Sequence, residues 1–462
     1  MNEDGILFLK QKGAAYMKYV LLMVICAAML LAGCVPTPEL KKQAEPAAVN
    51  SGDTITQNIP DTLDREEALA DGIRLKVKAN VVKPDGELSV GTVKRYPFDV
   101  STVKRLGEIL WGNAPMYEYY EPKHELAEYI VACREQMEAA KDALSDSDIA
   151  FIETTLKDME AAMPNAPDEG KPATYEKIFG YDNGFIKVDT GKGRQALFQA
   201  LSSEHRNILS FLDLGFKKQL VEEIEPLRVT EEDAIRQANE ILEQLGLKDQ
   251  FSVVKTGVHP INHTIVDQVL ANKGYHFPER HERRYVIFMR KIGNAKQVYS
   301  EQIQYGSTDG GYDAAVFWEV MEFQFDNDGL VSFTWQEPGD VTVTEKAVSV
   351  IDLDTAYEAM LTYLRSSQNR YTYEECDLLP ERVTISIDRI ELGMSCILGT
   401  NRTIEAVPVW EFYGEIEYED GSGRTRCVNL REGRLTDETR GCNSICTINA
   451  LNGKRIDREL GY

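Results

Sequence analysis

The chain has 462 residues, and its 51 Lys and Arg side chains stand against 75 Asp and Glu, so the formal net charge is −24 at pH 7. Hydrophobic residues make up 43% and charged residues 27%, which is the balance of a globular protein rather than a disordered one. So acidic a surface argues against a nucleic-acid partner and against broad docking on anionic lipid headgroups. At roughly 100–200 residues per domain, the length predicts about two to four domains.

The N-terminal region carries the pattern of an export signal. Lys18 precedes an apolar run of 13 residues, Tyr19–Leu31, and small residues follow that run. A basic residue, an apolar run and small residues in this order are typical of a secretory signal peptide. The run is too short to cross a hydrocarbon core of ~30 Å, which needs about 20 residues. Residues 1–33 are therefore predicted to be removed on export.

The end of this run, Leu31-Ala32-Gly33-Cys34, resembles the lipobox of bacterial lipoproteins. The resemblance implies cleavage between Gly33 and Cys34 and a diacylglyceryl group on the sulfur of Cys34. Two acyl chains supply a lasting membrane anchor, whereas one chain binds only reversibly. The predicted location is the extracytoplasmic face of a bacterial cell membrane. The alternative interpretation is a buried core helix that ends in a cysteine.

The first half of the mature chain is predicted to hold a tether and one α+β domain. Residues 34–65 are polar, contain proline and lack periodicity, which is typical of a flexible tether. Residues 66–225 form the predicted domain. Its expected elements are a strand at 73–82, a helix at 101–111, a hairpin of helices at 125–144 and 149–163 with an N-cap in Ser145–Asp148, and short strands within 185–214.

The second half contains an internal repeat. A capping-box pattern begins at Thr230 and opens an amphipathic helix that ends at Gly246. A second such helix follows with the same apolar spacing, and Asp352 or Asp354 is its expected cap. The matching positions are 122 residues apart: Ala234 with Ala356, Leu242 with Leu364, and the strand Tyr285–Met289 with Val407–Trp410.

Each repeat ends in a glycine-containing hairpin, Phe323–Gly329 in the first and Thr447–Gly453 in the second. The order of one helix, three strands and a hairpin predicts two tandem modules, at 226–340 and 341–462. In each, one helix would pack on one face of an antiparallel sheet. The predicted fold class is thus multi-domain α+β, with antiparallel sheets each packed against helices and a tandem helix-plus-sheet repeat in the C-terminal half.

Three segments of these modules resemble the PepSY-like and YycI/YycH-like modules of extracytoplasmic lipoproteins and membrane regulators. They are Thr230–Ala234, Val407–Phe412 and Ile448–Gly453, and the resemblance covers residues 226–462. The whole chain is also similar to uncharacterised clostridial lipoproteins that carry a domain of unknown function. The resemblance implies a binding or regulatory role outside the membrane, an extracytoplasmic protein partner and no catalytic residues to carry over.

A cluster of histidines is the candidate for metal chemistry. His259, His263, His276 and His281 fall within 23 residues, and Glu279 or Glu282 could add an oxygen ligand for Zn²⁺. However, Pro260 follows the first histidine, and no H-E-x-x-H pattern is present. A polar loop between two strands is the favoured interpretation. A metal-dependent surface hydrolase that uses this cluster stays as an alternative.

Two other motifs are interpreted as turns. Asp189-Thr190-Gly191 resembles one half of an aspartic-protease site, but it has no second copy. Asp326-Asn327-Asp328-Gly329 resembles half of a calcium loop, but it lacks the later glutamate and fits a hairpin turn. The Gly191-x-Gly193 pair lacks the third glycine of a phosphate loop. We therefore expect no cofactor.

Cysteine usage leaves the disulfide question open. Apart from Cys26 in the signal and Cys34 at the anchor, six cysteines remain: Cys133, Cys376, Cys396, Cys427, Cys442 and Cys446. An exported chain permits disulfides, and six cysteines allow 15 connectivities. None of them forms a C-x-x-C pattern.

Together these features predict a lipid-anchored extracytoplasmic lipoprotein with a non-catalytic binding or regulatory role. Besides the hydrolase, a solute-binding lipoprotein is an alternative. The chain lacks the long βαβ alternation that is usual for such receptors.

Overall fold

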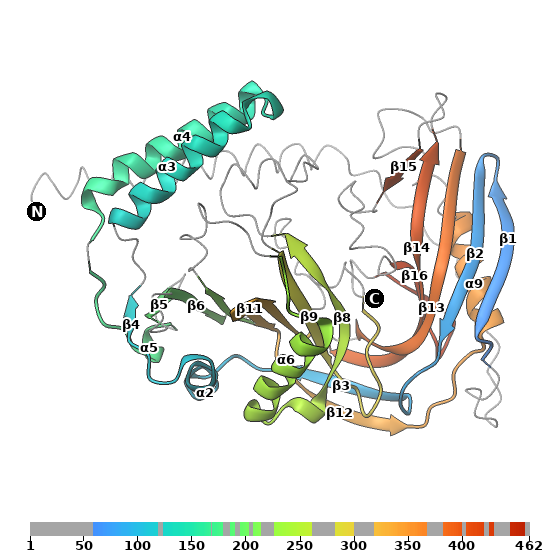
Figure 1. Ribbon diagram of the computed structural model, residues 1–462. Coiled ribbons are helices and arrows are strands. Elements are labelled where there is room, and N and C mark those ends of the chain that lie inside the picture. Colours follow the sequence, from blue (N-terminus) through green and yellow to red (C-terminus); the bar gives the residue numbers. More distant parts are fainter. Residues whose placement is uncertain are drawn as a thin grey trace, which may run out of the picture. The chain divides into compact units, whose positions relative to one another are not determined.

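The fold is described from a computed structural model (Figure 1). The described residues are 59–118, 123–167, 169–178, 185–189, 195–202, 207–213, 226–260, 282–299, 318–366, 382–399, 403–419, 425–428 and 444–457. All of them belong to one of the two units into which the chain divides, residues 51–306 with 314–462.

The described strands form two sheets. Sheet A holds β1 (Thr62–Ala70), β2 (Ile73–Val82), β3 (Ser89–Arg95), β12 (Gly339–Lys346), β13 (Arg382–Leu398), β14 (Ile404–Glu419), β15 (Thr425–Val428), β16 (Ser444–Asn449) and β17 (Arg455–Ile456). Sheet B holds β4 (Met116–Glu118), β5 (Phe185–Asp189), β6 (Gln195–Ser202), β7 (Asn207–Asp213), β8 (Phe251–Pro260), β9 (Glu282–Arg290), β10 (Val320–Asp326) and β11 (Gly329–Gln336).

The described helices are α2 (Val100–Trp111), α3 (Lys123–Ala139), α4 (Asp146–Ala162), α5 (Tyr175–Ile178), α6 (Glu231–Leu245) and α9 (Leu353–Ser366). Short 3₁₀ turns lie at Lys141–Ala143, Met163–Asn165 and Lys248–Gln250. Among the described residues, no helix is both long and apolar enough to span a bilayer.

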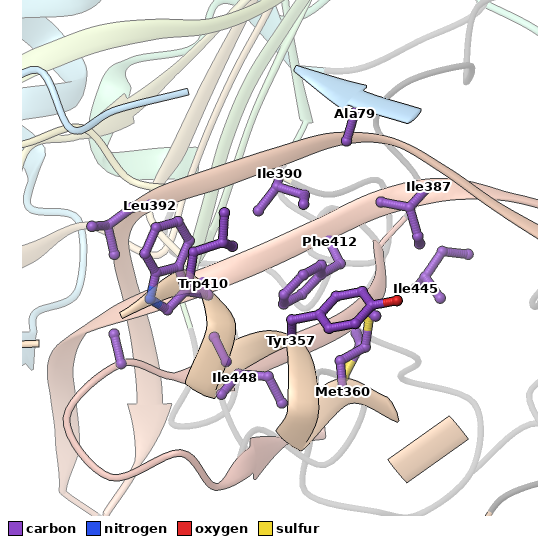
Figure 2. Close-up of a cluster of buried hydrophobic side chains, with 14 of the residues drawn as sticks. Ala79, Tyr357, Met360, Ile387, Ile390, Leu392, Trp410, Phe412, Ile445 and Ile448 are labelled. Carbon is purple, nitrogen blue, oxygen red and sulfur yellow. The ribbon is translucent and has the colours of Figure 1, made fainter. Parts of the chain in front are cut away.

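Sheet order confirms the predicted α+β fold class. Sheet B runs β4-β5-β6-β7-β11-β10-β9-β8, and every neighbouring pair in it is antiparallel. Sheet A follows the path β1-β2-β13-β14-β16-β17, in which β2 and β13 are the parallel pair. Helices α6 and α2 share an apolar core with sheet B, and α9 shares one with sheet A. In this second core Tyr357 and Met360 of α9 lie beside Phe412 of β14 (Figure 2).

The tandem repeat is confirmed as two units of the same topology. The first is α6-β8-β9-β10-β11 and the second is α9-β13-β14-β16-β17, and the strands have the same spatial order in both. The buried helix positions also correspond at an offset of 122: Ala234 with Ala356, Ala238 with Met360, and Leu242 with Leu364. An amphipathic helix buries its apolar face against the sheet. Because the two sheets have the same strand order, equivalent helix positions are buried in both units.

The helix ends follow the predicted capping chemistry. The Thr230 side chain accepts a hydrogen bond from the N–H of Asp233 at 3.1 Å, and Gly246 ends α6 in the left-handed region with φ +76°. Of the two candidate caps of α9, Asp352 accepts the bond from the N–H of Thr355 at 2.7 Å. Polar side chains at these positions replace the helical partners that terminal N–H groups lack.

The helical hairpin α3–α4 has an apolar core of its own. Its buried residues are Leu126, Ile130, Cys133, Leu144, Ile152 and Leu156. Ser145 and Asp148 form a reciprocal capping box at the start of α4. The first helix ends at Ala139 rather than at the predicted Leu144, because a 3₁₀ turn at Lys141–Ala143 tightens the connection.

The strands are distributed differently from the predicted contiguous domains. Region 66–225 supplies strands to both sheets, because β1, β2 and β3 enter sheet A while β4 to β7 enter sheet B. Residues 339–340 of the first predicted module already belong to β12 in sheet A. Strand β1 includes residues 62–65 of the predicted tether, and Leu63 and Leu69 bury their side chains in the core beneath α9.

Equivalent positions of the two units should be equally sensitive to truncation. Leu242 and Leu364 are both fully buried, at 0% exposure. We expect Leu242→Ala and Leu364→Ala each to lower the free energy of unfolding by about 2–5 kcal/mol, measured by urea denaturation. Glu243→Ala, on the exposed face of α6, is the matched control and should cost less than about 1 kcal/mol. A loss below that level at either leucine would contradict the shared packing.

Candidate functional site

Most residues singled out in the sequence lie outside the described residues. Gly33 and Cys34 are among them, as are His263, His276 and His281. The backbone of His259 lies in β8, opposite Arg283 of β9. Among the described residues no group of three or more His, Cys, Asp or Glu side chains is placed to hold a metal ion. Asp189 ends β5, and the rest of its Asp-Thr-Gly motif is outside the described part.

The half calcium loop lies in the β10–β11 hairpin. Gly329 has φ +120°, and the Asp326 carboxylate accepts a hydrogen bond from the N–H of Asp328 at 2.8 Å. The predicted turn therefore accounts for these residues, because glycine tolerates a positive φ.

Of the six cysteines that follow Cys34, three are described with their side chains, and each of them is buried: Cys133, Cys396 and Cys446. Burial raises the pKa of the Cys446 thiol far above its ordinary value. A thiol kept protonated in this way is a poor nucleophile.

The first buried polar cluster surrounds Arg290 and Glu319. The Arg290 guanidinium donates to both carboxylate oxygens of Glu319, with Nη2–Oε1 at 2.9 Å. Trp335 Nε1 donates to the same carboxylate at 3.0 Å, and the N–H of Gly339 does so at 3.3 Å. Burial raises the pKa of Glu319, and these donors oppose that shift by favouring the ionised form. Burial, together with the nearby Glu319, raises the pKa of Tyr96 to about 12.

This cluster connects the two sheets. Arg290 and Trp335 come from sheet B, whereas Gly339 begins β12 of sheet A. Glu337 lies in the chain between Trp335 and Gly339. Its carboxylate accepts hydrogen bonds from Arg95 Nη1 at 3.0 Å and from the N–H of Asn207 at 2.8 Å. Both carboxylates are thus engaged by donors within the protein. We interpret the cluster as a structural junction.

A second polar cluster lies within sheet A. Glu391 of β13 and Glu411 of β14 are direct cross-strand neighbours, and they are 8% and 0% exposed. The Glu411 carboxylate accepts from the Ser444 hydroxyl and from the Thr447 hydroxyl, the latter at 2.8 and 2.9 Å. Arg389 donates to Glu391 at 2.5 Å. Burial raises the pKa of Glu391, and the neighbouring Glu411 adds to the shift while Arg389 and Lys296 oppose it.

Burial and the neighbouring carboxylate favour the protonated form of Glu391, because a second charge beside Glu411 is costly in a medium of low dielectric constant. Pairs of this kind serve acid–base chemistry in enzymes when substrate reaches them. Glu391 and Glu411 are buried within the sheet, and we therefore interpret the pair as structural. Sequence reasoning missed the pair because only strand register brings Glu391 beside Glu411. The available signal was a glutamate inside the apolar run Val407–Phe412.

A further candidate site is the outer edge of β8, the last strand in the order of sheet B. Within the described part of the chain, β8 pairs with β9 alone. Lys255 Nζ lies 5.6 Å from the ring centroid of Tyr285 and 5.7 Å from that of Tyr299. Gly257 lies under Tyr285, since a Cβ added there would come within 2.4 Å of the phenol oxygen. A sheet edge offers main-chain donors and acceptors to an extended peptide.

Removing one partner of the Arg290–Glu319 pair should be costly. We expect Glu319→Ala to lower the free energy of unfolding by about 3–5 kcal/mol, because it leaves a buried guanidinium without its counter-charge. The control is Glu419→Ala in the exposed Arg382–Glu419 pair, expected to cost less than about 1 kcal/mol. Urea denaturation measures both. A cost for Glu319→Ala no larger than the control would show that the junction is dispensable.

The Glu391 carboxyl should make stability depend on pH. Its pKa is raised above the ordinary 4.5, so the folded protein binds more protons than the unfolded chain as pH rises past that value. The free energy of unfolding then falls with rising pH. We expect Glu391→Gln to be more stable than the parent at pH 7, with the two converging below about pH 4. The free energy of unfolding of both proteins would be measured by urea denaturation across this pH range. A difference between them that does not change with pH would contradict the raised pKa of Glu391.

No protein-family model matches the chain, and no curated protein matches it. Among solved structures it is similar to the crystal structure of an uncharacterised protein from Eubacterium rectale ATCC 33656, with 9% identity and a TM-score of 0.41. That match covers 87% of this chain and 97% of the other.

Proposed function

We propose that the protein is a lipid-anchored extracytoplasmic lipoprotein that binds or regulates a protein partner without catalysing a reaction. The lipobox at Leu31–Cys34 supports the anchor, and the acidic composition is consistent with a body that does not itself dock on anionic lipid. The two units of one helix followed by four antiparallel strands support the resemblance to PepSY-like modules.

One observation carries the binding role. The carboxylates buried most deeply in the described residues, Glu319, Glu337 and Glu411, each accept hydrogen bonds from groups of the protein itself. These buried carboxylates therefore serve to connect neighbouring strands through hydrogen bonds. What the fold offers to a partner is main-chain surface along a sheet edge, which suits recognition of another polypeptide.

The anchor is tested by replacing the acylated cysteine. We expect Cys34→Ala to move the protein from the membrane fraction to the soluble or secreted fraction, because it removes the only sulfur in the lipobox. Cys26→Ala, eight residues earlier in the same apolar run, is the matched control and should stay in the membrane fraction. Equal membrane retention of both variants would contradict the anchor.

The binding role is tested by crosslinking intact cells and purifying the Cys34-anchored chain. A specific protein recovered with the parent and lost with an unanchored variant supports the proposal. Recovery of a processed small substrate or product, with no protein partner, would overturn it.

A further inference from the structure

The order of one helix and four antiparallel strands occurs a third time in the described chain. Helix α2 comes before β4, β5, β6 and β7, which are neighbours in that order in sheet B, and Leu106 of α2 shares an apolar core with Phe198 of β6. The helical hairpin α3–α4 lies between the first and second of these strands. Only residues 399–403 separate the corresponding strands β13 and β14. The hairpin is therefore an insertion into a loop of the N-terminal copy.

The hairpin is joined to this copy by main-chain pairing and has an interior of its own. The N–H of Glu118 donates to the carbonyl of Lys171 at 2.7 Å, and the N–H of Ala173 donates to that of Met116 at 2.9 Å. Beyond this base, the buried core of α3 and α4 consists of residues of the hairpin alone. Insertions into single repeats often form the binding face of a repeat protein. The hairpin is therefore a candidate contact surface.

One face of the hairpin holds its central basic residues. Arg134 and Lys157 each come one position after a buried residue of their helix. Arg134 pairs with Glu160 across the two helices, and Glu160 lies three residues after Lys157, so both cations belong to the same face. Val131 lies there as well, three residues before Arg134. At 3.6 residues per turn, positions one before the buried residues lie on the opposite face.

That opposite face is built around Phe151, which comes one position before a buried isoleucine. Phe151 is 56% exposed, and among the described residues the exposed large apolar side chains are Phe151 and Val131. No described position of this face, which we call the Phe151 face, holds a basic residue. Its other positions are Tyr129, Ala132, Gln136, Asp148, Thr155 and Asp158.

We propose that the Phe151 face of the hairpin binds a basic amphipathic helix of a partner protein, with an apolar side chain against Phe151 and a Lys or Arg beside Asp158. The inference rests on the proposed binding role, and it names one contact surface and the kind of ligand that this surface takes.

Charge selects a basic partner. Residues 123–162 hold ten acidic residues and four basic ones, a net charge of −6 in a chain whose total is −24. A quarter of the net charge thus lies in less than a tenth of the residues. On the Phe151 face Asp158 is exposed, and a partner cation beside it lies well within the Debye length of about 8 Å. An acidic partner would be repelled by the same charges.

The spacing of the Phe151 face suits a helical ligand. Its positions recur every three and four residues along α3 and α4, which lie side by side (Figure 1). Rows with this spacing are the ones by which helices pack on one another. The neighbours of Phe151 are small or already bonded, since Thr155 donates its hydroxyl to the carbonyl of Phe151 at 3.0 Å. An aromatic side chain in such a setting is the kind of residue that dominates binding energy.

The experiment uses the mature chain made soluble by Cys34→Ala and a fluorescein-labelled, capped peptide, Ala-Lys-Leu-Ala-Lys-Lys-Leu-Ala-Lys-Leu-Ala-Lys. In a helix its leucines share one face and its lysines lie outside that face. We expect saturable binding by fluorescence anisotropy, and binding that weakens as salt is added. A peptide with glutamate for each lysine, and one with serine for each leucine, should each bind about tenfold more weakly or worse.

A matched pair of variants locates the site on the hairpin. Phe151→Ala should weaken binding of the lysine peptide by about tenfold, because it removes the exposed aromatic side chain. Val131→Ala truncates an equally exposed apolar side chain on the opposite face and should bind as the parent does. Asp158→Lys should weaken binding by about threefold and reduce its dependence on salt, because it places a cation beside those of the peptide.

No saturable binding, or equal affinities of Phe151→Ala and Val131→Ala for the peptide, would overturn the proposal. Binding of the serine peptide as tight as that of the leucine peptide would overturn it too, because acidic charge alone would then account for the interaction. Crosslinking in cells separates this inference from the proposed function. If Phe151→Ala recovers the same partner as the parent, the hairpin assignment fails and the proposed function stands. If the parent recovers no protein partner, the proposed function fails.

Discussion

The structure depends on one long antiparallel ribbon. β13 and β14 pair at sixteen positions, from Arg382–Glu419 to Leu398–Ile404. At about 3.4 Å per residue the ribbon is roughly 55 Å long, far more than an average strand pair. Its two halves have different neighbours. The Arg382–Glu419 end is flanked by β2 and β15, the Leu398–Ile404 end by β3 and the segment Lys296–Val298, and β16 pairs with β14 between these ends. Sheet A is therefore assembled on the ribbon.

A ribbon of this length must bend, and the bend has a definite place. The register shifts between Ile387 and Arg389, leaving Asp388 as the extra residue. Gly414 lies beside this bulge, where an added Cβ would come within 1.8 Å of the carbonyl oxygen of Ser386. Only glycine fits at that approach. The halves on either side of the bend can then face different partners, and the Glu391–Glu411 pair lies just beyond it.

Local signals were read correctly from the sequence, and long-range pairing was not. Thr230, Gly246 and Ser145 act within one helical turn, so their roles were predictable from neighbouring residues. The pairing of β2 with β13 joins segments about 310 residues apart, and no local pattern specifies it. For the same reason Glu391 and Glu411 were not anticipated as a pair. The place of β8 at the end of sheet B follows from the strand order of the whole sheet, which no local pattern specifies either.

The two repeat units differ at one sheet edge among the described residues: β13 pairs there with Lys296–Val298, whereas β8 pairs with β9 alone. In the second unit the chain itself supplies Lys296–Val298, and this pairing joins a segment following β9 to β13. Satisfying that edge internally contributes to cohesion between the two units, as the Arg290–Glu319 junction does. Within the described part of the chain, both repeat units therefore share one strand order, while only the second binds a further segment of the chain at the outer edge of its first strand.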